Sequence, residues 1–247
     1  MLFLPSVFIF ILGTIFGSFA NVLIDRLPFE KSIGGRSKCE KCHHTLSGFE
    51  LIPLLSYVVQ RGRCRHCSSV IPPRLLFVEL INGLVWVLLF YLFGFSDILL
   101  FPIFTLLICM SLTDLENLTL PFSLVGLLII LSLTRFFILN MAIQTIYGGL
   151  ISLGLFSLIY LLTKKRGIGF ADLPFVFGLS LLLDWPDFIL MLWIAFVSGA
   201  LVGIILLRFK RQGMKDRIPF GPFLVLGTVL TFFYSQIIWR YLLNLVG

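Results

Sequence analysis

The chain has 247 residues, of which 59% are hydrophobic and 13% are charged, and its mean hydropathy is +1.06. This composition excludes a water-soluble globular protein and predicts several membrane spans. The net charge of +7 would be compatible with a nucleic-acid partner, but the basic residues gather in a few loops beside apolar segments. Membrane topology explains that pattern, so we expect a lipid bilayer and no nucleic acid as partner.

Apolar runs follow one another along the chain and predict an all-α polytopic membrane protein. A bilayer-spanning helix needs about 20 mostly apolar residues, and about eight runs meet or approach that length. They cover residues 2–24, 75–93, 98–113, 122–140, 144–163, 174–183, 188–207 and 219–238, the sixth being short. The first run has no basic residue ahead of it and no small-residue cleavage pattern. We therefore interpret it as a retained transmembrane helix and not as a signal peptide.

Basic residues predict how these helices are oriented. Short cytoplasmic loops are enriched in Lys and Arg. With eight spans, the three most basic segments fall on one side of the membrane: residues 25–74, Lys164 to Arg166 and Arg208 to Arg217. We expect these segments to be cytoplasmic and both termini to lie outside.

Two Cys-x-x-Cys pairs, Cys39 with Cys42 and Cys64 with Cys67, lie in the segment 25–74. Their spacing is close to that of four-cysteine zinc sites, and the reducing cytoplasm argues against the competing disulfides. Four sulfur ligands leave no open coordination position, so the expected zinc is structural. The pattern predicts a small zinc-ribbon-like insertion between the first two membrane helices.

Three histidines and one further cysteine accompany these pairs. His43, His44 and His66 lie beside the four cysteines, and each is a candidate to replace a thiolate as well as a solvated surface residue. Cys109 lies in an apolar run, and we interpret it as core packing.

Asp114 and Asp172 stand at the ends of apolar runs, at the cytoplasmic membrane face in this topology. Placing an acidic side chain at such a position costs free energy, so its presence there indicates a function. Two neighbouring carboxyl groups share a proton, so one can activate water as a base while the other acts as an acid on a peptide bond. Such a pair requires no cofactor for proteolysis. Helix capping is the alternative for each residue, and spacing alone does not choose between Asp114 and Glu116.

Other residues near these runs carry weaker signals. Gly167 and Gly169 precede Asp172 and would allow close approach of an extended substrate. Asp184 and Asp187 are expected in an outer loop.

Motifs along nearly the whole chain resemble the bacterial type IV prepilin peptidase family. They are the stretches Gly17 to Pro28, Glu50 to Pro53, Arg61 to Cys67, Ile71 to Leu80 and Ile218 to Phe223, together with the cysteine pairs. The first catalytic aspartate of the family precedes a proline by seven positions, as Asp114 precedes Pro121, and this favours Asp114 over Glu116. The second lies in a Gly-x-Gly-Asp motif that aligns with Asp172, although Ala171 replaces the second glycine and Pro174 stands where lysine is usual.

The resemblance implies cleavage of the basic leader of prepilins or pseudopilins at the cytoplasmic face of a bacterial inner membrane, with Asp114 and Asp172 as catalytic residues. Many members also N-methylate the new amino terminus with S-adenosylmethionine, an activity associated with the cysteine-bearing segment. Family analogy suggests Glu50, Arg74 and Glu79 as donor-binding candidates, each equally compatible with a structural role. The chain is thus divided into a first helix (1–24), a four-cysteine module (25–74) and a peptidase core (75–247).

Two other function classes stay open on the sequence. A transporter or channel also carries intramembrane acids, although its acids are expected throughout the membrane and not at one face. An inactive pilus or secretion assembly scaffold is the second alternative, and the departures at Ala171 and Pro174 keep it open.

Overall fold

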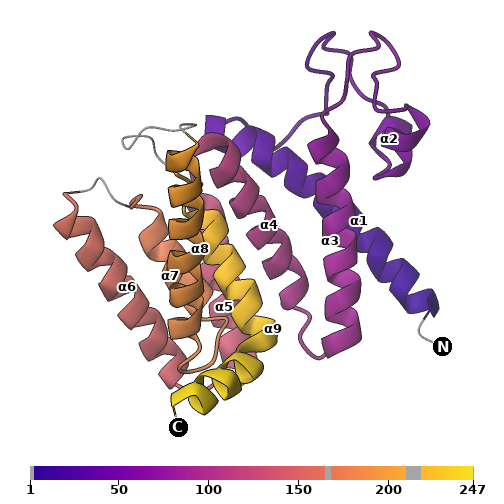
Figure 1. The fold of residues 1–247 in the computed structure, drawn as a ribbon. Helices are drawn as coiled ribbons and strands as arrows, with labels where there is room; N and C mark the ends of the chain where they lie inside the picture. Colours follow the sequence, from indigo (N-terminus) through magenta and orange to yellow (C-terminus); the bar gives the residue numbers. More distant parts are fainter. Residues whose placement is uncertain (1–2, 165–167, 210–217, 247) are drawn as a thin grey trace. The chain divides into compact units, whose positions relative to one another are not determined.

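The computed structural model describes residues 3–164, 168–209 and 218–246, and its elements in these ranges are all helices (Figure 1). The predicted all-α fold is therefore confirmed. The helices are α1 (Phe3–Arg26), η1 (Leu27–Phe29), η2 (Gly48–Leu51), α2 (Leu55–Val59), α3 (Pro73–Phe93), α4 (Leu100–Asn117), α5 (Phe122–Ile138), α6 (Gln144–Leu162), α7 (Asp172–Ser180), α8 (Phe188–Arg208) and α9 (Gly221–Val246).

Six of the described helices are long and apolar enough to cross a membrane: α1, α3, α4, α6, α8 and α9. Helix α5 is a shorter apolar helix of 17 residues, and α7 has only 9. At 1.5 Å per residue α7 rises about 14 Å, whereas the hydrocarbon core is about 30 Å thick. The predicted sixth run thus forms a helix that is too short to cross a bilayer by itself, because the helix ends at Ser180.

The chain divides into two compact units, Met1–Cys109 and Met110–Gly247. In the first unit, α1 and α3 approach each other through small residues. A Cβ atom added at Gly13 would lie 2.9 Å from the Cα of Gly83, and one added at Gly17 would lie 2.9 Å from the Cα of Glu79. Small residues are what allow two membrane helices to gain close backbone contact, since lipid removes the hydrophobic drive for helix association.

A buried polar network joins α3 to α1 and to the first turns of α4. The Asn82 side-chain amide donates to the Gly13 carbonyl at 2.7 Å, and the Thr105 hydroxyl donates to Asn82 Oδ1 at 2.9 Å. The Trp86 indole N–H donates to the Thr105 hydroxyl at 2.9 Å. Because a polar group in hydrocarbon is costly without a partner, each of these bonds also fixes how the helices meet.

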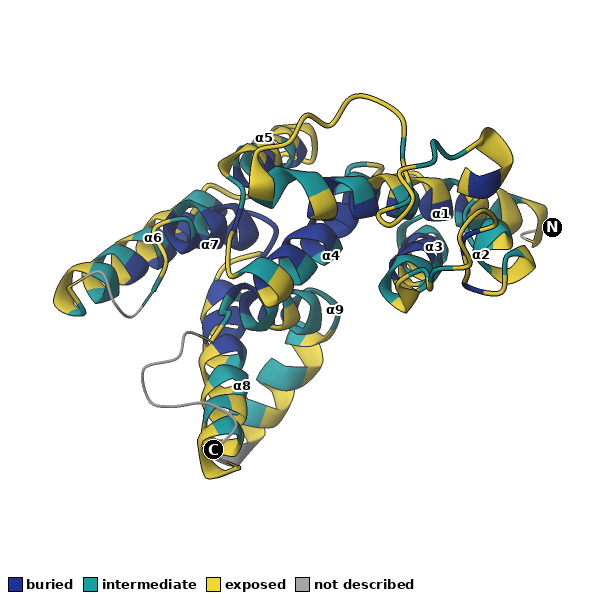
Figure 2. Ribbon diagram, turned by 90° about the horizontal axis from the view of Figure 1, so that it is seen from above, coloured by how far each residue is buried: buried dark blue, intermediate teal, exposed yellow. Residues whose placement is uncertain are grey.

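The second unit is organised around α7, which packs against α5, α6 and α9. Seven of its residues are buried, and dark blue marks the buried parts of its ribbon in Figure 2. Helix α8 packs along α9, where a Cβ atom added at Gly227 would collide with the carbonyl oxygen of Met191. These contacts bring the N-terminal ends of α7 and α9 into one compact unit with the last turns of α4.

The close approach of α1 and α3 yields a stability prediction. Gly17→Leu should destabilise the protein by about 1–3 kcal/mol or more, because the new side chain has no space against α3. The measurement is thermal unfolding in detergent, followed as the fraction of protein that stays monodisperse after heating. Gly154→Leu is the matched control, since a Cβ atom at Gly154 meets nothing within 4 Å. Equal midpoints for the two variants would contradict the packing argument.

Candidate functional site

Asp114 lies near the C-terminal end of α4 and is 6% exposed. Its Oδ2 accepts a 2.7 Å hydrogen bond from the backbone N–H of Gly221, the first residue of α9. The first N–H groups of a helix lack intrahelical acceptors, and the partial positive charge there stabilises a carboxylate. A Cβ atom at Gly221 would lie 2.8 Å from that same oxygen, so a larger residue would force the carboxylate to move.

Asp172 is the first residue of α7 and is 7% exposed. Its Oδ2 accepts a 2.9 Å hydrogen bond from the backbone N–H of Gly169, and a Cβ atom at Gly169 would lie 3.1 Å from this oxygen. Gly169 thus allows a close approach, as the sequence suggested, but its neighbour is the carboxylate itself. Gly167 lies outside the described residues.

Asp114 and Asp172 both lie in the second unit, where the charge of Asp114 acts on Asp172. The rival Glu116 is exposed on α4. Asp184 and Asp187 follow the other end of α7, where Asp187 accepts a 2.8 Å hydrogen bond from the indole of Trp239. The two buried carboxyl groups at the start of α7 and the end of α4 are therefore the ones that can act as a pair.

Ala171 and Pro174, the two departures from the Gly-x-Gly-Asp pattern, fit the backbone around Asp172. Ala171 has φ −70° and ψ −20°, a right-handed helical conformation that does not require glycine. Pro174 lies in the first turn of α7, where a helix does not use the backbone N–H that proline lacks. Neither residue disturbs the position of the Asp172 carboxyl group.

Aromatic side chains surround the residue that precedes Gly221. The ring of Phe220 lies 5.3 Å from that of Phe196 and 6.1 Å from that of Phe156, which is fully buried. This apolar cluster thus flanks Gly221, the residue that donates to Asp114. The role of Gly221 was not predicted from the sequence, where this glycine stood only within a family-like segment. The sequence feature that could have indicated this role is the pair Gly221 and Pro222 at the start of an apolar run.

The four cysteine sulfur atoms of the module all lie within 4.8 Å of one another. Two similar loops present them: the Cys39 carbonyl accepts from the N–H of His43 at 2.9 Å, and the Cys64 carbonyl accepts from that of Ser68 at 2.9 Å. His43 and Ser68 have left-handed φ angles of 55° and 56°. The five cysteines are free, so the pairs form no disulfide. This cluster is consistent with the predicted metal site.

The loops favour the thiolate form at Cys39 and Cys67, whereas burial and hydrogen bonds with the other three thiols raise the pKa of Cys42 to about 11. Hydrogen bonding from the backbone N–H of Cys42 contributes most to lowering the pKa of the Cys39 thiol from 9.0 to about 6. The Ser69 hydroxyl lowers the pKa of Cys67. The histidines lie outside the cluster of possible ligands that the described residues form, and the rings of His44 and His66 stack on each other at 3.5 Å.

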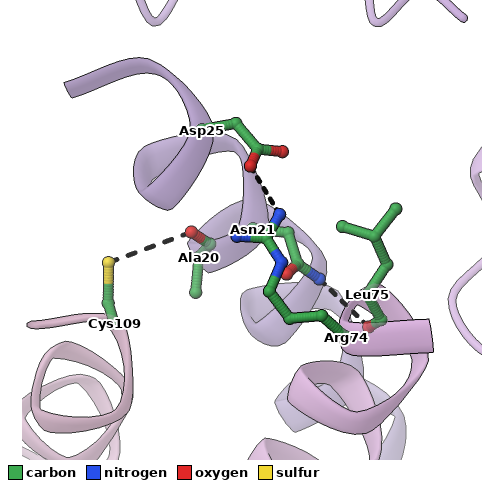
Figure 3. Close-up of polar contacts among 6 residues, drawn as sticks. All are labelled: Ala20, Asn21, Asp25, Arg74, Leu75 and Cys109. Carbon is green, nitrogen blue, oxygen red and sulfur yellow. Dashed lines mark hydrogen bonds and ion pairs between the residues drawn. The ribbon is translucent and has the colours of Figure 1, made fainter. Parts of the chain in front are cut away.

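Arg74 belongs to a set of contacts between α1 and α3 (Figure 3). It forms an ion pair with Asp25, and the Asn21 amide donates to the Leu75 carbonyl at 3.1 Å. In the same view the Cys109 thiol points to the Ala20 carbonyl, and Cys109 is fully buried, which confirms its place in the core. Arg74 thus links the start of α3 to the end of α1.

Glu79 and Glu50 are both largely buried and hold turns of the cysteine module. Glu79 Oε2 accepts a 2.8 Å hydrogen bond from the N–H of Leu54, whose φ angle of 61° is left-handed, and its carboxylate also bonds Ser18. Glu50 Oε2 accepts from the N–H and the hydroxyl of Ser47 at 2.9 Å each, which lowers the pKa of Glu50. Its Oε1 is buried and has no hydrogen-bond partner among the described residues.

Two protein families match the chain. Residues 11–93 match the family described as "Bacterial Peptidase A24 N-terminal domain", and residues 101–204 match the "Type IV leader peptidase family". The two matches together extend over the cysteine module and the segment that carries both aspartates.

Several curated proteins are similar to the chain over most of their length, each named "Prepilin leader peptidase/N-methyltransferase". The relative from Burkholderia pseudomallei (strain K96243) is 33% identical over 92% of this chain and 85% of its own length. The relative from Legionella pneumophila is 33% identical (81% and 73%), and that from Aeromonas hydrophila is 30% identical (96% and 93%). No solved structure matches. These matches show that the chain belongs to the type IV leader peptidase family of bacterial multi-pass membrane proteins.

Proposed function

We propose that this protein cleaves the basic leader peptide from type IV prepilins or pseudopilins, with Asp114 and Asp172 as its catalytic residues. The observation that carries the proposal is the pair of buried carboxyl groups, within range of each other's charge and each held by a glycine N–H. The substrate class follows from the family and from the names of the relatives. Asp114 and Asp172 are the buried acids among the described residues of the second unit, which does not favour a transport path lined by many acids.

The chemistry needs one ionised and one protonated carboxyl group. Two carboxylates in range of each other's charge do not both ionise easily, so in this mechanism the pair holds one proton. The ionised member removes a proton from water as the water oxygen attacks the scissile carbonyl carbon. The protonated member donates its proton to the carbonyl oxygen. A proton then passes to the leaving nitrogen as the C–N bond breaks. The glycine N–H groups of Gly169 and Gly221 keep the carboxyl groups in place throughout.

We place the pair at the cytoplasmic membrane face, with eight crossings and both termini outside. The basic segments support this orientation, because the positive-inside rule then holds for each of them. The short α7 is compatible with a crossing since its neighbours enclose it, and Leu181, Leu182 and Leu183 after it are also buried. Backbone that protein encloses at membrane depth need not form a full-length helix.

A second activity, transfer of a methyl group from S-adenosylmethionine to the new amino terminus, is part of the proposal. Its support is the name of the relatives, which includes N-methyltransferase. Zinc in the four-sulfur cluster would hold the two cysteine loops together as a structural ion. Among the three donor-binding candidates, Glu50 is the one that keeps a buried oxygen without a partner in the described part of the chain.

Loss of either carboxylate should abolish cleavage. Asp114→Asn and Asp172→Asn should each reduce the rate by about 10²–10⁴-fold, as expected for loss of a general acid or base. The reconstituted protein is incubated with a peptide that has a basic leader, a junction glycine and an apolar helix, and cleavage is followed by mass spectrometry. Glu116→Gln is the control and should cleave normally. An unchanged cleavage rate in both Asn variants would contradict the proposed mechanism.

The contact between Gly221 and Asp114 gives an independent prediction. Gly221→Ala adds a methyl group 2.8 Å from the Asp114 carboxylate, which must then move. The expected loss of cleavage rate is up to about 10²-fold, a typical effect of a displaced catalytic group. The loss should appear in kcat, measured with the same peptide. Gly126→Ala, which meets nothing within 4 Å, is the matched control, and equal kcat in both variants would contradict the assignment.

Metal content tests the cysteine cluster. Cys64→Ser should lower the bound zinc, measured by elemental analysis of the purified protein, from about one ion per chain to a small fraction, because a four-sulfur site loses a ligand. We expect peptide cleavage to persist and methyl transfer, read as a gain of about 14 Da, to fall. Cys109→Ser, outside the cluster, should retain the metal. An unchanged zinc content in Cys64→Ser would contradict zinc binding by the four cysteines.

A further inference from the structure

The cysteine module carries a continuous run of apolar side chains that are exposed on its surface. This run lies between the two cysteine pairs, on η2, on α2 and on the turn that joins them. Its exposed members are Phe49 (78%), Leu51 (40%), Ile52 (38%), Leu55 (63%), Val58 (65%) and Val59 (66%). A water-soluble surface rarely gathers so many large apolar side chains without a partner.

The apolar run forms one wall of a groove of about 740 Å³, and α1 forms the other wall. Ile11, Ile15 and Phe19 line the groove from α1, and residues 48 and 51–55 line it from the module. Helix α1 is one of the candidate membrane spans, and these three side chains are between 47% and 50% exposed. The module therefore reaches a stretch of α1 that belongs at the depth of the bilayer.

The hydroxyl groups that α1 presents to the groove have partners inside the protein. The Thr14 hydroxyl donates to the Ile11 carbonyl at 2.8 Å, and Ser18 bonds the Glu79 carboxylate. What the groove offers an occupant is thus apolar contact, which suits hydrocarbon. The apolar surface also continues past the groove, because Val58 and Val59 are exposed on α2 but are not part of its lining. A bilayer covers both areas, whereas a single substrate helix in the groove covers one.

Basic side chains accompany this apolar surface. Ser37, which lines the groove, stands between Arg36 and Lys38. Arg36 is exposed, and Lys38 lies at the first cysteine loop. Arg61 and Arg63, both exposed, follow shortly after α2. Basic residues beside a membrane surface attract anionic headgroups. An apolar face flanked by Lys and Arg is the pattern of a segment that lies in the membrane interface.

We propose that residues 48–59 lie in the bilayer leaflet on the side of the module, and that the groove beside α1 holds an acyl chain of an anionic phospholipid. The module is then docked onto the membrane by its own apolar segment. The basic residues Arg36, Lys38, Arg61 and Arg63 lie at the level of the phosphate groups.

Photolabelling with lipid tests this docking directly. The full-length protein is reconstituted in vesicles that contain phosphatidylglycerol with a diazirine in its acyl chain, and labelled peptides are identified by mass spectrometry. We expect label in residues 48–60 and along α1. The internal control is residues 63–70, where Val70 is also an exposed apolar side chain (72%) but lies outside the groove lining. Label on α1 without label on 48–60 would overturn the proposal.

Substitutions distinguish membrane docking from simple exposure of the segment to lipid. The double variant Val58→Asp with Val59→Asp should reduce label in 48–60 several-fold without changing zinc content, whereas Val70→Asp should leave the label unchanged. Replacing the anionic lipid by a phosphatidylcholine probe should also reduce it several-fold, and equal label would refute the headgroup contacts. If a prepilin peptide displaced the lipid label from 48–60, the groove would belong to the substrate helix and the lipid proposal would fail.

Discussion

Hydrocarbon offers no hydrogen-bond partner to a polar group, and this constraint decides how the membrane helices of each unit meet. In the first unit, Asn82 finds its partners on α1 and α4, and the Asn21 amide finds one on α3. Polar side chains thus link the helices through hydrogen bonds. Small residues such as Gly13 and Gly17 then bring the backbones close enough for these bonds to form.

The same constraint applies to the buried acids of the second unit. Removing carboxyl groups from water penalises their charge, and the low local dielectric strengthens the interaction between neighbouring charges. Asp114 and Asp172 each receive a backbone N–H in compensation, from Gly221 and Gly169. These bonds hold the two carboxyl groups in place, as the proposed peptidase chemistry requires. The short α7 contributes because its enclosed N-terminus carries Asp172 into this environment.

The cysteine module is too small to build a large hydrophobic core, so its fold depends on other interactions. Its turns are held by the cap that Ser47 and Glu50 form and by the bond between Leu54 and Glu79, and zinc in the four-sulfur cluster would add a further link. The bond between Leu54 and Glu79 fastens the module to α3. The apolar side chains that it leaves exposed then have a natural partner in the bilayer beside α1, so the module and the membrane stabilise each other.

The sequence by itself determined the features that local pattern encodes. Long apolar runs predict membrane helices, paired Cys-x-x-Cys spacing predicts a sulfur cluster, and an acid beside an apolar run predicts a functional carboxyl group. Tertiary structure alone decided that Asp114 is buried while Glu116 is exposed, that Gly221 is the partner of Asp114, and that α7 is short and enclosed. The reason is physical: burial and hydrogen bonding between residues far apart in the chain depend on how helices pack, and no local pattern carries that information.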